Sequence, residues 1–537
     1  MSRSLEGITS ESEWHVEPSH PETIESKTRT HVVSVENGRM WHREQMFDLA
    51  GNEIYDQSYS MRYVVGSGRR AKAYLHQRGD LLLMSPLNWY SQERKWDFAP
   101  SYAPDDYRRF DRRVTEDCLG CHSGRVASLG RGLNRYHEPA FREESIGCEN
   151  CHGPGKDHIA FYRSGGTDPA ADPIVNPAEL EPARRESVCY QCHLPGAVRV
   201  PRHGRSHLDF RPGMRFDEIW TVLADDAARD AKGRSRAVSH VQQMRSSRCY
   251  TASGERLGCI SCHDPHRVPA ESERVAFYRN RCNACHHDAG CSVPLMERAE
   301  KENSCIACHM PPLGTTNISH VTQTDHRVLK SYDAASESSP AAKEDSLTFF
   351  DDAHLRLAGW ERDRALGLGA YLYLSRSGRD LPAPLIRKLD DVLKTVPEDG
   401  EVLTTLGAIA LDHERLDLAR DYFERARAIP AAKEAALGGL LKVYYLSSNW
   451  NEALACAEWL VKLNPGDYRA QAMRADVLVH LGRLPEGIAA AETALRFNPT
   501  LVELRRTLVG WYRDAGETEE SQRQREILDR MEKVLGQ

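Results

Sequence analysis

The sequence predicts a mainly α-helical fold in which a small β-rich part comes first and a helical solenoid comes last. Three observations support this prediction. Residues 31–100 alternate between apolar and polar types, a pentapeptide with two cysteines and a histidine recurs between residues 118 and 309, and the sequence after residue 350 repeats with a period of 34. We therefore expect four segments: residues 1–100, 101–330, a linker at 331–350, and 351–537.

Composition excludes two classes of protein. The net charge of -7 in 537 residues is small, which argues against a nucleic-acid binder. No apolar run reaches the roughly 18 residues that a transmembrane helix needs, so no such helix is expected. The length is sufficient for about three domains.

The first segment, residues 1–100, is expected to contain a small antiparallel sheet. The sequence from His31 alternates apolar and polar residues up to Asn37-Gly38, which is a hairpin turn signal. A second hairpin signal, Arg78-Gly79-Asp80, separates two further apolar runs. No catalytic constellation is visible in this segment.

The second segment, residues 101–330, contains six copies of C-x-x-C-H, the attachment signature of c-type haem. The two thiols of each copy would form thioethers with the haem, and the histidine would be the proximal iron ligand. The thioether cysteines are Cys118, Cys121, Cys148, Cys151, Cys189, Cys192, Cys259, Cys262, Cys282, Cys285, Cys305 and Cys308. The proximal histidines are His122, His152, His193, His263, His286 and His309.

Two other interpretations of a C-x-x-C pair are a zinc site and a redox dithiol or disulfide. Neither requires a histidine directly after every second cysteine. Histidine makes up 23 of the 537 residues, yet it follows all six pairs. The pattern therefore favours six covalently attached haem c groups.

We expect the region at 101–330 to be packed around these haems. It is rich in Gly and Pro and has few long helical periods, so it has too little side-chain hydrocarbon for an ordinary core. Six porphyrins would supply the missing apolar mass. The last three motifs begin 23 residues apart, which predicts that they form a run.

The second axial ligand of each iron must come from outside the motifs. Seventeen histidines lie there, and the interpretation of a surface or core residue applies to most of them. Six lie beside a motif or in a distinctive local context, and these are the distal candidates: His20, His158, His240, His266, His320 and His326.

Three cysteines lie outside the motifs. Cys249 and Cys291 are predicted to form a disulfide, with two buried thiols as the alternative, and Cys456 is expected to be a core residue. Haem attachment takes place outside the cytoplasm, which implies a periplasmic or otherwise extracytoplasmic protein. Residues 1–14 do not have the layout of a signal peptide, so we expect that a leader is missing or the start is misassigned; a cytoplasmic protein is the alternative.

The last segment, residues 351–537, has the period of tetratricopeptide repeats. Small residues recur 34 apart at Ala419, Ala453, Gly487 and Ser521. Four repeats are expected over about 400–535, with a degenerate repeat at 366–399. Such stacks form a groove that binds protein partners, although a solenoid that caps the haem region is the alternative.

The chain resembles multihaem c-type cytochromes fused to tetratricopeptide repeats. Its haem region is similar to the group that contains the tetrahaem electron carriers of nitrification, hydroxylamine oxidoreductase and the pentahaem nitrite reductases. The phrases that carry the resemblance are Cys148-Glu-Asn-Cys-His-Gly-Pro-Gly, Cys259-Ile-Ser-Cys-His-Asp-Pro-His, Cys305-Ile-Ala-Cys-His-Met-Pro and Thr324-Asp-His. Family members often carry one further C-x-x-C-H before a segment like residues 14–20, which is absent here. No C-x-x-C is followed by Lys, so the reaction centre of the nitrite reductases is not present.

The resemblance implies an electron carrier whose haems are mostly held by two histidines. Its partners would be redox proteins and a protein bound by the repeats, and no catalytic residue is assigned. Two alternatives remain. One is an oxidoreductase that acts on a small nitrogen or sulfur compound at one open haem. The other is a repeat-based scaffold in which the haems form a docking module.

Overall fold

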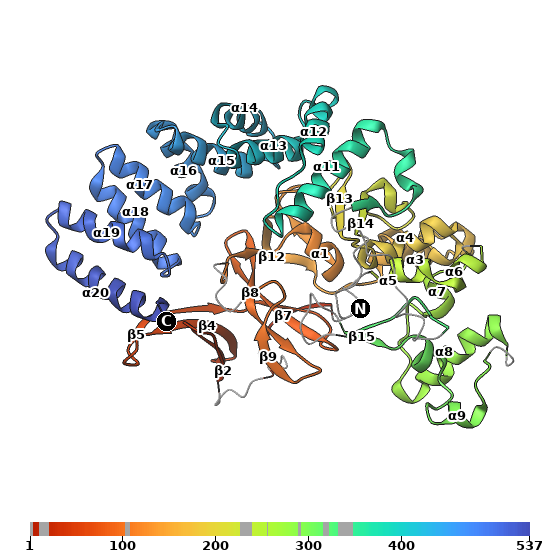
Figure 1. The fold of residues 1–537 in the computed structure, drawn as a ribbon. Helices are drawn as coiled ribbons and strands as arrows, with labels where there is room; N and C mark the ends of the chain where they lie inside the picture. The colour runs from red at the N-terminus through yellow and green to blue at the C-terminus, as the bar shows by residue number, and fades with distance from the viewer. Residues whose placement is uncertain are drawn as a thin grey trace. The chain divides into compact units, whose positions relative to one another are not determined.

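The computed structural model describes residues 4–9, 15, 21–102, 108–225, 239–254, 256–287, 291–314, 322–330 and 347–536. The chain divides into two compact units. One unit is Ile146–Ala358, and the other combines Ser2–Ser145 with Gly359–Gln537. About half of the chain is helical, several small sheets lie in its N-terminal region, and the C-terminal region is helical (Figure 1).

Two antiparallel sheets form the N-terminal part of the second of these units, where a single small sheet was expected. One has the order β2-β3-β4-β5, with bounds Glu22–Glu25, Thr30–Glu36, Arg39–Phe47 and Glu53–Ser60. The other has the order β1-β6-β7-β8-β10, with β9 on β8, and its bounds are Leu5–Gly7, Tyr63–Val65, Ala71–Arg78, Leu81–Tyr90, Arg112–Arg113 and Lys95–Phe98. Asn37 and Gly38 both have positive φ, so the predicted turn between β3 and β4 is confirmed.

The core of these sheets determines where the first motif lies. Val33, Met40 and Leu87 belong to a buried cluster between the two sheets. A second cluster on β6, β7 and β8 includes Leu119 of α1 (Glu116–His122), which is 1% exposed. The hairpin of β11 (Arg125–Ser128) and β12 (Tyr136–Glu143) completes this layer. Burial of Leu119 thus fixes the helix that carries the first C-x-x-C-H.

The tetratricopeptide helices stack as the 34-residue period predicts. The would-be Cβ atoms of Gly407 and Gly439 lie 2.7 and 2.3 Å from the ring of Phe423, so the two glycines make room for this ring. Ala419 and Ala453 are fully buried. The helices are α11 (Gly359–Ser375), α12 (Ala383–Thr395), α13 (Gly400–Asp412), α14 (Leu416–Ala426), α15 (Lys433–Leu446), α16 (Trp450–Leu463), α17 (Tyr468–His480), α18 (Leu484–Phe497), α19 (Val502–Asp514) and α20 (Thr518–Leu535).

One edge of the repeat stack binds the chain's own sheets. Glu434, in the first turn of α15, accepts hydrogen bonds from Arg113 at 2.5 Å and from Arg135 at 2.9 Å. Asn498, just before α19, accepts one from Arg109 at 2.9 Å. The helices α15–α20 consequently arch beside the sheets of the same unit (Figure 1). Ser2–Ser145 and Gly359–Gln537, which we expected to belong to separate domains, lie in one unit.

The other unit contains short helices and strands. Its apolar core is a cluster around Trp220 that includes Leu194, Phe216 and Val241. The helices are α2 (Glu149–His152), α3 (Lys156–Arg163), α4 (Pro182–His193), α5 (His240–Ser246), α6 (Arg248–Ala252), α7 (Cys259–Cys262), α8 (Glu271–His286), α9 (Leu295–Ala299) and α10 (Cys305–His309). The 3-10 helices are Pro169–Ala171, Pro177–Glu179, Phe216–Glu218 and Asp352–Arg356. The strands are β13 (Val198–Pro201), β14 (Trp220–Asp225), β15 (Pro312–Gly314), β16 (Thr322–Thr324) and β17 (Leu347–Phe349).

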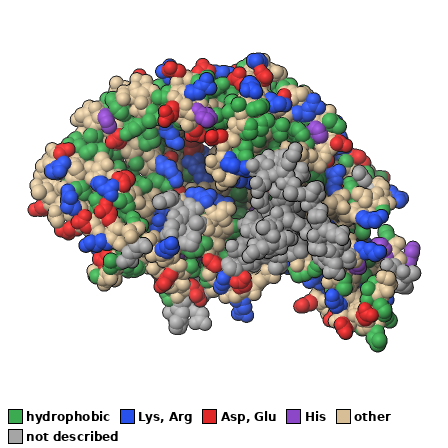
Figure 2. Space-filling view, viewed as in Figure 1, with side chains coloured by type: hydrophobic (Ala, Val, Ile, Leu, Met, Phe, Trp, Pro, Cys, Tyr) green, Lys and Arg blue, Asp and Glu red, His purple; other side chains and the backbone are tan. Residues whose placement is uncertain are grey.

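Most helices of this unit bury little against protein. Among their described residues, α2, α3, α7, α8, α9 and α10 contain no buried residue. Met296 of α9 is 85% exposed, and hydrophobic side chains are visible at the surface of the segment that contains α9 (Figure 2). Across the described residues of both units, no helix combines the length and the hydropathy that crossing a membrane would require.

Candidate functional site

Each of the six motifs lies at the end of a helix. Five of the helices, α1, α2, α4, α8 and α10, end at the motif histidine, and α7 ends at Cys262, directly before His263. The two cysteines of a motif are three residues apart, which places both sulfurs on the same side of a helical turn. The histidine follows at the C-terminus of the helix. This local geometry suits two thioethers and one axial ligand on the same porphyrin.

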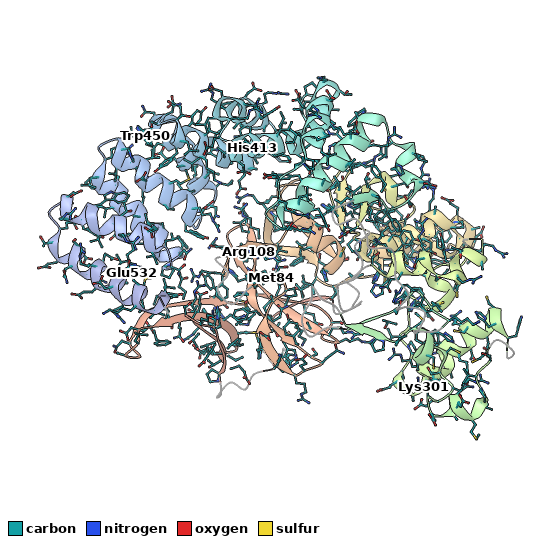
Figure 3. All side chains as sticks on the ribbon, viewed as in Figure 1. Met84, Arg108, Lys301, His413, Trp450 and Glu532 are labelled. Carbon is teal, nitrogen blue, oxygen red and sulfur yellow. The ribbon has the colours of Figure 1, made fainter. Side chains whose placement is uncertain are left out.

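The motifs are divided between the two units. The first, with Cys118, Cys121 and His122, belongs to the unit with the sheets and repeats, and the other five belong to Ile146–Ala358. Lys301, labelled in Figure 3, lies between α9 and α10 and marks the chain just before the sixth motif. Met84 and Arg108, also labelled, lie in the N-terminal part that contains the first motif (Figure 3).

Thiols of neighbouring motifs contact one another. Cys189 and Cys259 form a hydrogen bond that lowers the pKa of Cys189 and raises that of Cys259. Burial and the nearby Cys305 raise the pKa of Cys282 to about 12. The contacts also show that the third motif lies beside the fourth, and the fifth beside the sixth.

Three motif histidines each face a histidine from elsewhere in the sequence. His152 and His266 have ring centroids 5.8 Å apart, with an angle of 11° between the ring planes. The separation is 5.4 Å for His193 and His240. It is 6.3 Å for His263 and His326. An iron about 2 Å from one nitrogen of each ring would hold two imidazole centres about 6 Å apart, so these separations fit bis-histidine ligation of haem.

Hydrogen bonds at Nδ1 orient several of these rings. His152 Nδ1 lies 2.9 Å from the carbonyl oxygen of Val175, and His309 Nδ1 lies 2.7 Å from that of Leu329. His326 Nδ1 lies 2.9 Å from the carbonyl oxygen of Thr324. A proton on Nδ1 leaves Nε2 with a lone pair, which is the usual state of a metal-ligating histidine.

His158, on α3, has the same kind of support, but among the residues that the structure describes no motif histidine ring contacts it. Its Nδ1 lies 2.8 Å from Asp172 Oδ2. Desolvation acts to raise the pKa of Asp172, but hydrogen bonds from His158 and from the backbone of Ile174 lower it overall, so the carboxylate is charged at neutral pH. His158 makes its ring contact with Tyr162.

The remaining candidates are not brought together. His20 and His320 lie outside the described residues. Within the part of the chain that the structure describes, no second histidine ring contacts His122, His286 or His309. The same described residues contain no cluster of three or more His, Cys, Asp or Glu side chains suited to a bare metal ion.

The predicted disulfide is wrong in this structure. Cys249 and Cys291 are both free thiols, and Cys291 is exposed. Burial raises the pKa of Cys262, and the nearby thiols of Cys249 and Cys285 raise it further. Cys456 is 5% exposed, which confirms it as a core residue, and burial raises its pKa to about 11.

Sequence reasoning missed the groups that support the ligands. They include the carbonyls of Val175 and Leu329, the carboxylate of Asp172, and Gln243, whose side-chain oxygen accepts a hydrogen bond from the His326 backbone. A backbone carbonyl carries no residue-specific signal. Asp172 and Gln243 are ordinary residue types at unremarkable spacings from the motifs, so no sequence signal could have selected them.

Two parts of the chain match protein-family models. Residues 93–153 match the model of cytochrome c554 and c-prime, and residues 440–501 match a tetratricopeptide repeat model. Cytochrome c-554 of Nitrosomonas europaea is 29% identical over 144 residues, which cover 24% of this chain and 54% of that protein. The chain thus spans about half the length of this curated relative. Together these matches support a c-type cytochrome joined to tetratricopeptide repeats.

Solved structures of MamA resemble about a third of the chain. MamA from Desulfovibrio magneticus RS-1, from residue 41 to its end, is 18% identical and has a TM-score of 0.30, with 32% of this chain and 95% of that chain covered. Another crystal structure of MamA is 18% identical with a TM-score of 0.28, covering 34% of this chain and 99% of that chain. At these TM-scores the likeness does not bear on function.

Proposed function

We propose that this c-type cytochrome with tetratricopeptide repeats is an extracytoplasmic electron carrier that holds six covalently attached haem c groups. The observation that carries the proposal is the set of three histidine pairs. Each pair joins a motif histidine to a second histidine at the separation that one iron requires. Such a ligand set suits electron transfer, because neither axial position is left for a substrate.

The proposed axial pairs are His152 with His266, His193 with His240, and His263 with His326. Haem bound at such a site supplies one-electron chemistry between Fe(III) and Fe(II). The chain's own groups fix the ligands. The carbonyls of Val175 and Thr324 hold Nδ1 of His152 and His326, so that Nε2 of each ring is the ligating nitrogen.

The packing of residues 146–358 supports haem as the missing core. Helix α8 has 16 residues and buries none of them. A helix of this length gains most of its stability from a packed apolar face, and α8 has no such face against protein. Porphyrins attached at Cys282 and Cys285 would supply it. The contacts between thiols of the third and fourth motifs, and of the fifth and sixth, support short steps between haems.

A second candidate function is an oxidoreductase, and a specific observation favours it. In the described part of the chain, His122, His286 and His309 have no second histidine ring in contact. A haem at one of these motifs would have an open axial position unless a residue outside the three pairs, such as His20, His158 or His320, provides the ligand. The substrate class would be a small nitrogen or sulfur compound that binds iron.

The repeats are proposed to bind a protein partner, which would be a redox protein or a docking protein. Their edge at Glu434 and Asn498 also holds the sheets that carry the first motif. A partner on the free faces of the repeats would therefore be placed near the first haem. A scaffold in which the haems act only as a docking module would bind its partner equally well without haem.

Intact mass and spin state test the proposal. Protein exported with the haem-attachment machinery should gain the mass of six haems, and the double variant Cys282→Ala/Cys285→Ala should gain five. Zinc, or fewer than six haems in the mature protein, contradicts the stoichiometry.

Low-spin signals from at least three irons are expected in the resting protein. Turnover of hydroxylamine or nitrite at a high-spin haem would replace the carrier with the oxidoreductase.

A further inference from the structure

Helix α5 connects two of the proposed axial pairs. Its first residue is His240, the proposed distal ligand opposite His193. Gln243 follows three residues later, which places it on the same side of the helix as His240. Gln243 is 3% exposed, and its Oε1 accepts a hydrogen bond from the backbone N–H of His326 at 2.7 Å.

The start of α5 is held rigidly. The Ser239 hydroxyl accepts a hydrogen bond from the Gln242 backbone at 3.1 Å, and Gln242 Oε1 accepts one from the Ser239 backbone at 3.2 Å. This reciprocal pair is a capping box, which fixes the first turn of a helix. It therefore fixes His240 and Gln243 relative to each other.

His326 lies in a short segment, residues 324–327, which we call the strap and which is held by several hydrogen bonds. Asp325 is fully buried, and its carboxylate accepts hydrogen bonds from Arg327 Nε at 3.0 Å and Nη2 at 2.6 Å. The Thr324 carbonyl holds Nδ1 of His326 at 2.9 Å. These contacts lie within the strap, whereas the bond to Gln243 joins it to a helix 83 residues earlier in the chain.

We infer that Gln243 is a positioning residue that sets His326 against the iron of His263, and that α5 thereby couples the sixth ligands of two neighbouring haems. The inference rests on the axial pairs of the proposed function. The rings of His240 and His326 meet at 4.6 Å and 89°. That separation is too short to hold an iron between them, so the two rings belong to different irons and touch each other.

The variant Gln243→Leu tests the inference, because it keeps an apolar stem of similar size and removes the acceptor. We expect one haem per chain to change from low-spin to high-spin, or to a mixture of both. The reduction potential of that haem should shift, and the protein should gain binding of up to one cyanide per chain. Gln243→Glu keeps an acceptor oxygen at the same place and should restore the low-spin spectrum.

Two further variants separate the possible failures. Met244→Leu, on the same helix, should leave every spin state and potential unchanged. If His326→Ala opens an iron but Gln243→Leu changes neither spin states nor potentials, the positioning role is wrong and the axial pair stands. If His326→Ala opens no iron, the axial pair itself is wrong.

A second variant applies if Gln243→Leu does not mature. Gln243→Asn shortens the side chain by one methylene, and it must show part of the same spectral change for the inference to hold.

Discussion

His266 follows the fourth motif by three residues, yet its ring faces His152 of the second motif at 5.8 Å. At the scale of single residues, proximity in sequence thus selected His266 as a candidate ligand but did not indicate which motif histidine its ring contacts. His266 has 77% of its side chain exposed to solvent, which matches a position against a large flat ligand rather than against protein.

Substitution of His266 should open one iron. In His266→Ala, we expect one low-spin haem to become high-spin, because on the proposed ligation the two thioethers and His152 would still hold the porphyrin. Electron paramagnetic resonance of the oxidised protein measures the change. His413→Ala, directly after the repeat helix α13, serves as the control and should leave the spectrum unaltered. An unaltered spectrum in both variants would remove His266 from the ligand set.

Buried titratable residues in the sheets should make their unit sensitive to acid. Burial lowers the pKa of His42 from 6.5 to about 3 and that of His76 to about 4. Burial acts to raise the pKa of Glu44, but the Arg109 guanidinium at 2.7 Å together with His31 and Arg29 outweighs it and lowers the pKa from 4.5 to about 2. In all three cases the unfolded chain binds protons at a higher pH than the folded one does, so stability is complete above about pH 6.5 and falls below it.

The variant His42→Gln tests this sign. Between pH 6.5 and 4 the free energy of unfolding of the wild type should fall by a few kcal/mol more than that of His42→Gln, which has lost one titrating group. Denaturant midpoints followed by circular dichroism at several pH values give the two slopes. Equal slopes in the two proteins would show that His42 does not contribute.

At the scale of elements, the repeat helices depend on a few close contacts. Gly438 and Gly439 are neighbours on α15, but a Cβ on Gly438 would meet nothing within 4 Å, whereas one on Gly439 would lie 2.3 Å from the Phe423 ring. An aromatic ring packed between helices cannot move aside freely.

These neighbouring glycines provide a matched pair of variants. Gly439→Ala should destabilise the repeats by about 1–3 kcal/mol through overpacking. Gly438→Ala should stabilise them by about 0.5–1 kcal/mol, because alanine is the better helix former. Thermal unfolding followed by circular dichroism measures both. Equal effects of the two substitutions would contradict the packing of Phe423.

The sequence predicted the elements well where the signal is local. The hairpin at Asn37-Gly38, the helical repeats and the small residues at Ala419 and Ala453 all follow from short-range patterns. It did not predict how the sheets contact the repeats. The hydrogen bond from Arg109 to Asn498 joins residues that are 389 positions apart, and neither residue type indicates that the other is its partner. The histidine pairs could not be predicted for the same reason, since each joins a motif histidine to a histidine in a distant part of the sequence.

At the scale of the molecule, Glu434 holds two strands that flank the first motif. Arg113 lies on β10, shortly before α1, and Arg135 directly precedes β12. The side chain of Arg135 is 5% exposed, and its guanidinium forms ion pairs with Glu434 and Asp80. Hydrogen bonds from both arginines hold the pKa of Glu434 below its usual range, although burial opposes them.

Removal of this carboxylate should loosen the unit. We expect Glu434→Ala to lower its free energy of unfolding by about 1–3 kcal/mol, because a largely buried guanidinium loses a charged partner. Chemical denaturation measures the loss, and Glu458→Ala, an exposed glutamate on α16, is the control. If both variants unfold at the same denaturant concentration, the contact is not part of what joins sheets and repeats.

The division of the chain has a consequence for biogenesis. Ile146–Ala358, with five of the six motifs, is inserted between the two segments that build the other unit. A chain delivered from its N-terminus therefore presents the first motif and the sheets, then the five inserted motifs, and only at the end the helices that contact the sheets. On the proposed function, haem attachment at the six motifs would therefore begin before Arg109 can contact Asn498, and the enzymes of cytochrome maturation would act on an incompletely folded chain.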